Sequence, residues 1–299
     1  MTPTSTSTFN VDHAYGTADY AMNGAVDSTN AATLAARYGP HSPAAKSGHQ
    51  QYFVNPQSAF DFFALNTHRP LFADARIRQA VNYAIDRAAL ARLGNPFFPL
   101  PADPTDHYLP PGIPGHVDGH IYPLVPDLTK ARRLAKGHAG ATAVLYTFNR
   151  PVFTEQAQII KNDLAAIGIR VVVKAFPVPV LYHRLRTPGE PFDIAYGGWV
   201  ADYPDPQGVL DPLLQTSSNV PPFDDPSYRA KLRAAARLSG PERYLRYARL
   251  DRDLVRNAAP LAVYENVSSH ELFSARMGCQ TYGFYGIDLA ALCIKRAAR

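Results

Sequence analysis

The stretch FDIAYGGWVADYPDPQGVLDPLL, residues 192–214, decides the fold class and also holds the most distinctive polar residues of the chain. Large apolar side chains alternate with Asp193 and Ala195 over residues 192–196, as they do in a half-buried strand. Gly197 and Gly198 follow, and two adjacent glycines permit a bend or the close approach of another group. We therefore predict a strand that runs into a polar, aromatic turn around the only tryptophan, Trp199.

The residues before this stretch predict a strand–helix–strand unit. Residues 141–148 and 169–176 are apolar and strand-like, and the second run is rich in β-branched side chains. Between them, residues 153–167 carry apolar side chains at helical spacing. Such a unit joins parallel strands by a right-handed crossover, so we predict a mixed α/β sheet. Open α/β sheets bind ligands at the carboxyl ends of their strands, which makes the tryptophan turn a candidate site.

The turn has a structural and a functional interpretation. Trp199 could fill a gap in the core while Asp202 or Asp205 stabilises a turn stiffened by the neighbouring prolines. Alternatively, the carboxylate of Asp202 binds a ligand beside the aromatic side chains. The chemistry of these residues leaves both interpretations open.

Three stretches resemble parts of one known family, in the order in which that family carries them. The stretches are WVADYPDP at 199–206, LNTHRPLFADARIRQAVNYAIDRAAL at 65–90, and GIDLAALCIKR at 286–296. The first resembles the C-terminal-lobe signature of family 5 solute-binding proteins, the dipeptide-, oligopeptide- and nickel-binding components of ABC transporters. The other two resemble that family's passage from hinge strand to first helix and its C-terminal end.

This resemblance implies an α/β fold of the periplasmic-binding-protein type (type II, cluster C-like). The chain would comprise the C-terminal lobe and a remnant of the first lobe. We expect a disordered tail at residues 1–12, a first-lobe remnant with a hinge strand at 13–66, the C-terminal α/β lobe at 67–265, and a return to the first lobe at 266–299.

The resemblance also implies that this sequence lacks the N-terminal part of the family. Family members begin with a signal peptide, whereas MTPTSTSTFN has neither a basic start nor an apolar stretch. We therefore expect a truncated form. Family members bind their ligand between two closing lobes, and ordinary clefts bury most of a small ligand. With one lobe largely absent, we expect weak or no affinity.

In peptide-binding relatives the aspartate of the first motif pairs with the α-ammonium of the ligand. Carried over to this sequence, Asp202 takes that role, Trp199 is the aromatic residue beside it, and Tyr203 is the third candidate ligand-binding residue. The resemblance implies a monomeric, non-enzymatic protein without cofactor that binds a small peptide or similar solute. It would work with ABC-transporter permease subunits outside the cytoplasm, in the periplasm or as a cell-surface lipoprotein.

Two other functions stay open at this point. A cytoplasmic ligand-sensing or interaction module could be built on the same lobe, and the absence of a signal peptide supports it. A hydrolase using Asp202 and Asp205 is the weaker alternative. Its chemistry needs two carboxylates on either side of a scissile bond, and nothing in the sequence indicates that placement.

Charge and hydropathy exclude further classes. The chain has 30 Lys and Arg against 25 Asp and Glu, and arginines are frequent over residues 229–256. Acidic residues interrupt this basic segment and no nucleic-acid-binding motif is present, so we predict a solvated helix face and no nucleic-acid partner. No apolar run approaches the length of about 20 residues that crosses a bilayer, so we predict no membrane span.

The histidines and cysteines give no metal-binding pattern. His107, His116 and His120 are loosely spaced in a proline-rich segment, which predicts a surface loop without a metal site. Cys279 and Cys293 are 14 residues apart and have no Cys or His ligands grouped near them. Either a disulfide or two buried free thiols would fit.

Overall fold

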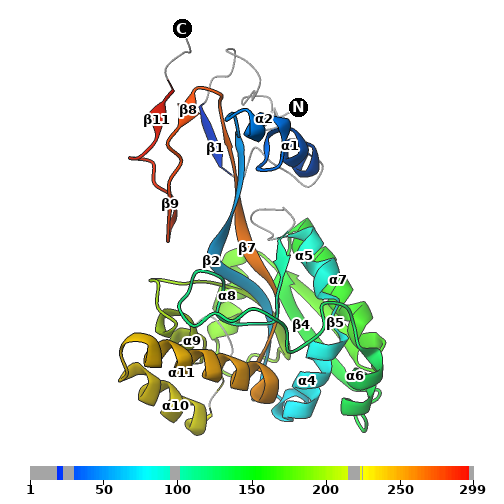
Figure 1. Ribbon diagram of the computed structural model, residues 1–299. Helices are drawn as coiled ribbons and strands as arrows, with labels where there is room; N and C mark the ends of the chain where they lie inside the picture. Colours follow the sequence, from blue (N-terminus) through cyan, green and yellow to red (C-terminus); the bar gives the residue numbers. More distant parts are fainter. Residues whose placement is uncertain (1–18, 23–29, 95–101, 215–222, 224, 296–299) are drawn as a thin grey trace.

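The computed structural model describes residues 19–22, 30–94, 102–214, 223 and 225–295. A large α/β lobe lies below a smaller upper part, and two long strands connect them (Figure 1). We call the described residues from 59 to 265 the main lobe, and the other described residues the upper part, because separate hydrophobic clusters lie in each. The predicted tail at 1–12 lies outside the described residues, and the predicted domain boundaries stay predictions.

Helices and strands are interspersed along the chain. The helices are α1 (Ala31–Tyr38), α2 (Pro43–Lys46), α3 (Pro70–Ala73), α4 (Ala75–Ala84), α5 (Arg87–Leu93), α6 (Leu128–Leu134), α7 (Pro151–Ala165), α8 (Val178–Arg186), α9 (Gln207–Leu214), α10 (Pro226–Ala236) and α11 (Gly240–Asp253), with a π-helical turn at Leu254–Ala258. The strands are β1 (Tyr20–Met22), β2 (Tyr52–Leu65), β3 (Asp103–Pro104), β4 (Thr142–Phe148), β5 (Arg170–Phe176), β6 (Ile194–Val200), β7 (Leu261–Phe273), β8 (Met277–Gly278), β9 (Tyr282–Gly283), β10 (Gly286–Ile287) and β11 (Cys293–Ile294).

One sheet runs through both parts, with strand order β1-β7-β2-β6-β4-β5, and β3 pairs with β7. The long strands β2 and β7 are antiparallel along their length, from the upper part down into the main lobe. Strands β4 and β5 are parallel and are connected through α7, which confirms the predicted strand–helix–strand unit. Strand β6 is parallel to β4 and antiparallel to β2, so the sheet changes direction at the strand that carries Trp199.

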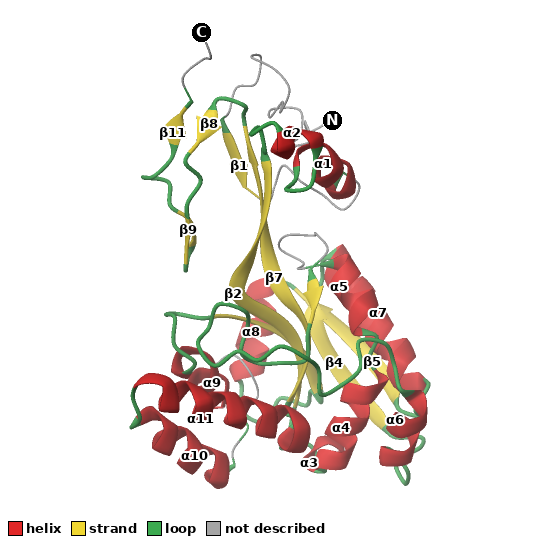
Figure 2. Ribbon diagram, viewed as in Figure 1, coloured by secondary structure: helices red, strands yellow, loops and turns green. Residues whose placement is uncertain are grey.

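The main lobe has a hydrophobic core on each face of its sheet. Neighbouring side chains of β2 point to opposite faces, so that Phe62 packs in one core and Phe63 in the other. Helices α3 to α8 contribute to the core around Phe63, whereas α9, α10 and α11 contribute to the core around Phe62. The helices therefore flank the sheet on both sides (Figure 2), which gives three layers and confirms the predicted α/β class.

Three aspartates begin helices of the main lobe. The side chain of Asp74 accepts a hydrogen bond from the backbone N–H of Arg76, at 2.8 Å. Asp86 and Asp127 cap α5 and α6 through backbone N–H groups three residues further on. Each cap satisfies a backbone donor that has no partner inside its helix, so these helix starts depend on local sequence.

The upper part has little core. Its hydrophobic cluster consists of Ala31, Tyr38, Tyr52 and Leu272. A disulfide joins Cys279, directly after the short strand β8, to Cys293 of β11, which decides between the two states that the sequence leaves open. Covalent and polar contacts therefore supply much of what holds this part together.

Candidate functional site

The strand that leads to the candidate site is longer than predicted. Trp199 and Val200 belong to β6, so the prediction that Trp199 lies in a turn after the strand is wrong. The reason is tertiary: β2 pairs with β6 in an antiparallel register that places Phe60 opposite Trp199. This pairing extends the strand past the two glycines, and the turn begins only after Val200.

Gly197 and Gly198 permit a close approach, which is one of the two functions predicted for them. A Cβ atom at position 197 would collide with the ring of Phe62, and one at position 198 would collide with the carboxylate of Asp61. Both Phe62 and Asp61 lie opposite these glycines on β2. The glycines therefore let the β2 side chains cover β6, and no bend is needed.

Trp199 and Tyr203 both contact α9. The indole Nε1 of Trp199 donates a hydrogen bond to the carbonyl oxygen of Gly208, at 3.1 Å. The ring of Tyr203 lies against the same glycine, so closely that a Cβ at position 208 would sit 3.1 Å from its Cζ atom. Trp199 is half-buried, whereas Tyr203 is 43% exposed. The two aromatic side chains thus fix the turn against the first residues of α9.

Asp205 has a structural role in this turn. Its two carboxylate oxygens accept hydrogen bonds from the guanidinium of Arg243 at 2.7 and 3.0 Å, and the backbone N–H of Gln207 adds a third. Partial burial opposes the charged form, but these hydrogen bonds hold the pKa of Asp205 below its ordinary value. Asp205 therefore fastens the turn to α11 and leaves little capacity for another partner.

Asp202 differs from Asp205 in the burial of its carboxylate and in the hydrogen bonds that the carboxylate forms. Its side chain is exposed, and among the described residues its carboxylate forms no hydrogen bond and no ion pair. Its backbone carbonyl accepts a hydrogen bond from the hydroxyl of Tyr285, at 2.7 Å. Tyr285 lies between β9 and β10, so this bond links the turn of the main lobe to the hairpin of the upper part.

The same tyrosine lines a cavity whose surface is mainly apolar, with several polar side chains among its lining residues. This cavity has a volume of about 410 Å³, and its polar lining residues are Tyr20, Gln57, Ser268, Ser269, Glu271 and Tyr285. Glu271 is buried, and its carboxylate accepts hydrogen bonds from Tyr20 at 3.1 Å and from Asn55 at 3.4 Å. Tyr285 therefore contacts both the turn that carries Asp202 and this cavity.

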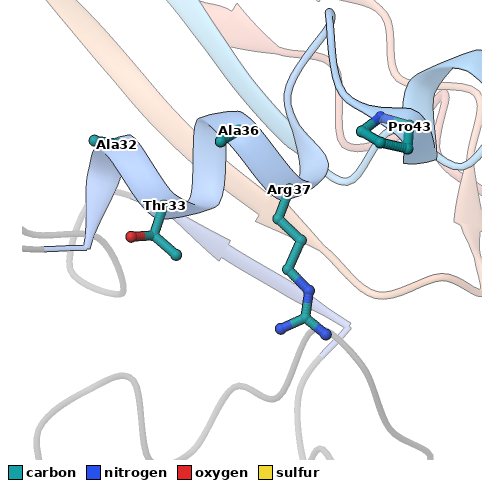
Figure 3. A pocket seen from close by; sticks show the side chains of 5 residues that line it. All are labelled: Ala32, Thr33, Ala36, Arg37 and Pro43. Atoms are coloured by element: carbon teal, nitrogen blue, oxygen red, sulfur yellow. The ribbon is translucent and has the colours of Figure 1, made fainter.

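A larger cavity, of about 640 Å³, lies away from this turn. It is lined by Ala32, Thr33, Ala36, Arg37 and Pro43, and Figure 3 shows the guanidinium of Arg37 extending from α1 beside the small side chains. It contains none of the three predicted site residues. Size alone therefore does not identify the site.

The structure corrects the prediction for the histidine segment. His107 is buried instead of lying on a surface loop, with one ring nitrogen 2.7 Å from Asp251 and the other 3.1 Å from the carbonyl oxygen of Gly119. Burial opposes the imidazolium form, but the hydrogen bond and charge of Asp251 raise the pKa of His107 above 6.5. In the described part of the chain, no three His, Cys, Asp or Glu side chains form a metal-binding group.

A buried pair of acids was not predicted. Asp61 of β2 and Glu265 of β7 face each other in the strand register, where the main lobe meets the upper part. The hydroxyl of Tyr196 donates a hydrogen bond to Asp61 at 3.0 Å. Burial, together with the charge of Asp61, raises the pKa of Glu265 well above 4.5. The available signal was an acid inside the apolar run AFDFFAL, residues 59–65.

Comparison with known proteins identifies the family. The family model described as "Bacterial extracellular solute-binding proteins, family 5 Middle" matches residues 12–221. The chain belongs to this family. The stretches at 65–90 and 199–206 lie within the matched residues, and the resemblance of the chain to this family is thereby confirmed. None of the described helices is long and apolar enough to cross a membrane.

Curated relatives of the chain are named as binding proteins. Heme-binding protein A of Haemophilus influenzae is 27% identical over 212 residues, which are 67% of this chain and 38% of that protein. Glutathione-binding protein GsiB of Salmonella typhi is 27% identical over 244 residues, 76% of this chain and 46% of its own length. The chain thus spans less than half the length of these two relatives.

Solved structures confirm the periplasmic-binding-protein type of fold. The clavulanic acid biosynthesis oligopeptide binding protein 2 has a TM-score of 0.73 at 24% identity, and the match covers 84% of this chain and 50% of that one. DppA of Helicobacter pylori, a periplasmic binding protein solved with the peptide STSA, has a TM-score of 0.66 at 22% identity, with 90% and 56% coverage.

Proposed function

We propose that this chain binds a small peptide or a similar small solute for import by an ABC transporter, and that Asp202 receives the solute's cationic group. The observation that carries this proposal is the contrast within one turn. Asp205 is bound by Arg243, whereas the carboxylate of Asp202 is exposed and has no partner among the described residues. An α-ammonium group would supply the missing opposite charge.

Neighbouring residues hold the backbone of this turn in place. Trp199 and Tyr203 hold it against Gly208, and Tyr285 holds the carbonyl of Asp202. A carboxylate on a fixed backbone loses less conformational entropy on binding than one on a free loop. Trp199 and Tyr203 would therefore act mainly by positioning Asp202, with the exposed part of the Tyr203 ring available to the solute.

The proposal includes the location and the partners. The named relatives bind heme or glutathione, and a further relative from Pseudomonas aeruginosa is a probable di/tripeptide-binding protein. The disulfide between Cys279 and Cys293 supports a site outside the cytoplasm, because disulfides persist in oxidising compartments. We propose that the protein acts there as a monomer, together with ABC-transporter permease subunits.

The two alternatives gain less support. The disulfide argues against a cytoplasmic sensing module. A hydrolase using Asp202 and Asp205 would need both carboxylates free to exchange protons, but Arg243 occupies both oxygens of Asp205.

Isothermal titration calorimetry with di- and tripeptides tests the proposal, using free and N-acetylated forms of each peptide. We expect the free peptides to bind with the low affinity of a site formed mainly by one lobe, and Asp202→Asn to weaken binding by at least about 30-fold, the lower bound for removing one partner of a desolvated charge pair. Glu155→Gln is the matched control, because Glu155 is an exposed carboxylate on α7. Equal binding by Asp202→Asn, or equal binding of the acetylated peptides, would remove Asp202 from the site.

A further inference from the structure

The excess positive charge of the chain is concentrated on one helix pair. Residues 225–257, which include α10 and α11, contain nine Lys and Arg against four Asp and Glu. The whole chain has 30 against 25, so the remaining residues carry 21 of each sign and are neutral in total. The net charge of +5 therefore belongs to this segment alone. We call the exposed side of α10 and α11 the cationic face.

A groove lies between the two helices of the cationic face. It has a volume of about 400 Å³ and is lined by Ala230, Lys231, Ala234, Arg246, Arg249, Leu250 and Asp253. Lys231 is neutralised by Asp253 at 2.6 Å. Arg246 and Arg249 are exposed, and no ion pair or hydrogen bond to their guanidinium groups occurs in the described part of the chain. Alanine and leucine side chains therefore line the same groove as two guanidinium groups that have no partner among the described residues.

Beside the groove, an apolar side chain is exposed among the arginines. Leu245 is 58% exposed. Positions 245, 249 and 252 share one side of α11 because they are separated by four and three residues. Leu245 thus lies on the same face as Arg249 and Arg252, both of which are also exposed. The sequence predicts a solvated helix face here, and such a face does not account for the exposed Leu245.

We propose that the cationic face binds an anionic phospholipid surface, with a lipid phosphate between Arg246 and Arg249. Guanidinium groups bind phosphate oxygens in bidentate fashion. Ala230, Ala234 and Leu250 would accept the apolar part next to that phosphate, and Leu245 would enter the interfacial layer. An amphiphile with an anionic head fits this combination better than an acidic protein segment, which would leave the alanines and leucine uncovered.

Vesicle co-sedimentation of the whole chain tests this proposal. We expect binding to phosphatidylcholine vesicles that contain phosphatidylglycerol, none to pure phosphatidylcholine, and a decrease with rising salt. The double variant Arg246→Gln/Arg249→Gln should lower the partition coefficient on the order of 30-fold, since each basic residue near an anionic surface contributes about fivefold. Arg133→Gln/Lys136→Gln is the matched control, because it removes two exposed cations from the region of α6.

Three results would overturn the proposal. Equal losses in the two double variants would show that only net charge matters and would overturn the assignment to the groove. Absence of binding to the anionic vesicles, or retention on immobilised polyglutamate without binding to vesicles, would overturn the lipid proposal, and the second result would assign the face to an acidic protein. Circular dichroism verifies that each variant is folded. Peptide calorimetry does not enter this test, so the proposal can fail independently of the proposed function.

Discussion

The main lobe and the upper part share the strands β2 and β7, yet these strands are stabilised differently in each. In the main lobe, every residue of β2 from 59 to 65 is buried, because helices cover both faces of the sheet. In residues 52–58, which run through the upper part, most side chains of β2 are half-buried or exposed. The same strand is thus a core element in one region and a connecting ribbon in the other.

The difference indicates which forces maintain each region. Burial of apolar side chains on two faces stabilises the main lobe, whereas the upper part has four residues in its cluster. The upper part adds the disulfide and the ion pair of Arg276 with Asp19 at 2.6 Å. Exposed ion pairs contribute little, so we expect the disulfide to matter most there.

A pair of leucine substitutions should separate the two regions most strongly. Leu145 of β4 and Leu272 of β7 are both buried, one in the main lobe and one in the upper part. Leu145→Ala should lower the free energy of unfolding of the main lobe by about 2–5 kcal/mol. Leu272→Ala should change that transition by less than about 1 kcal/mol, because the upper part opens locally.

Urea denaturation followed by tryptophan fluorescence measures both variants, since Trp199 is the only tryptophan and lies in the main lobe. Equal effects of the two substitutions would show that the two regions unfold as one unit, and the comparison would not hold.

Removal of the disulfide should loosen only the upper part. The bridge joins residues 14 apart in sequence, and closing a loop of this size stabilises by about 3 kcal/mol. In Cys279→Ser/Cys293→Ser we expect faster amide hydrogen exchange in β8 and β11, with the fluorescence transition of the main lobe unchanged. Protection of β8 and β11 equal to that of the unaltered protein would contradict this expectation.

Replacement of Glu265 tests the boundary between the regions through pH. Its raised pKa means that the folded state binds a proton more tightly than the unfolded state. This stabilisation is complete below pH 4.5, the ordinary pKa, and is lost as pH rises towards the raised value. Glu265→Gln cannot lose a proton and offers Asp61 an amide donor, so we expect it to be about 1–3 kcal/mol more stable at neutral pH.

Urea denaturation from pH 5 to pH 8 measures this effect, with Glu155→Gln as the exposed control. We expect the unaltered protein and the control to lose stability as pH rises, and Glu265→Gln to lose less. The same pH slope in all three proteins would show that Glu265 does not bind the proton.

Local features of the fold were predictable. The crossover from β4 through α7 to β5 follows from apolar periodicity, and the capping aspartates Asp74, Asp86 and Asp127 bond to backbone groups a few residues away. The hinge strand expected within residues 13–66 is observed as β2. These predictions succeed because the interactions that determine them lie within one segment.

Non-local contacts were not predictable. Trp199 belongs to a strand because β2 pairs with β6, and His107 is buried because Asp251 of α11 reaches it. Asp61 and Glu265 meet only through the register of β2 and β7. Each contact joins residues that are far apart in sequence, and no local spacing encodes them.

The sequence by itself determined the family, the α/β class and the turn that holds the candidate site. Only the tertiary structure decided how the two aspartates of that turn differ, because Arg243 approaches Asp205 from another helix and leaves Asp202 exposed. The hydrophobic pattern and the capping residues act over a few positions, so they can be read along the chain. The partner of a carboxylate depends on which distant side chain the packing brings within hydrogen-bonding distance.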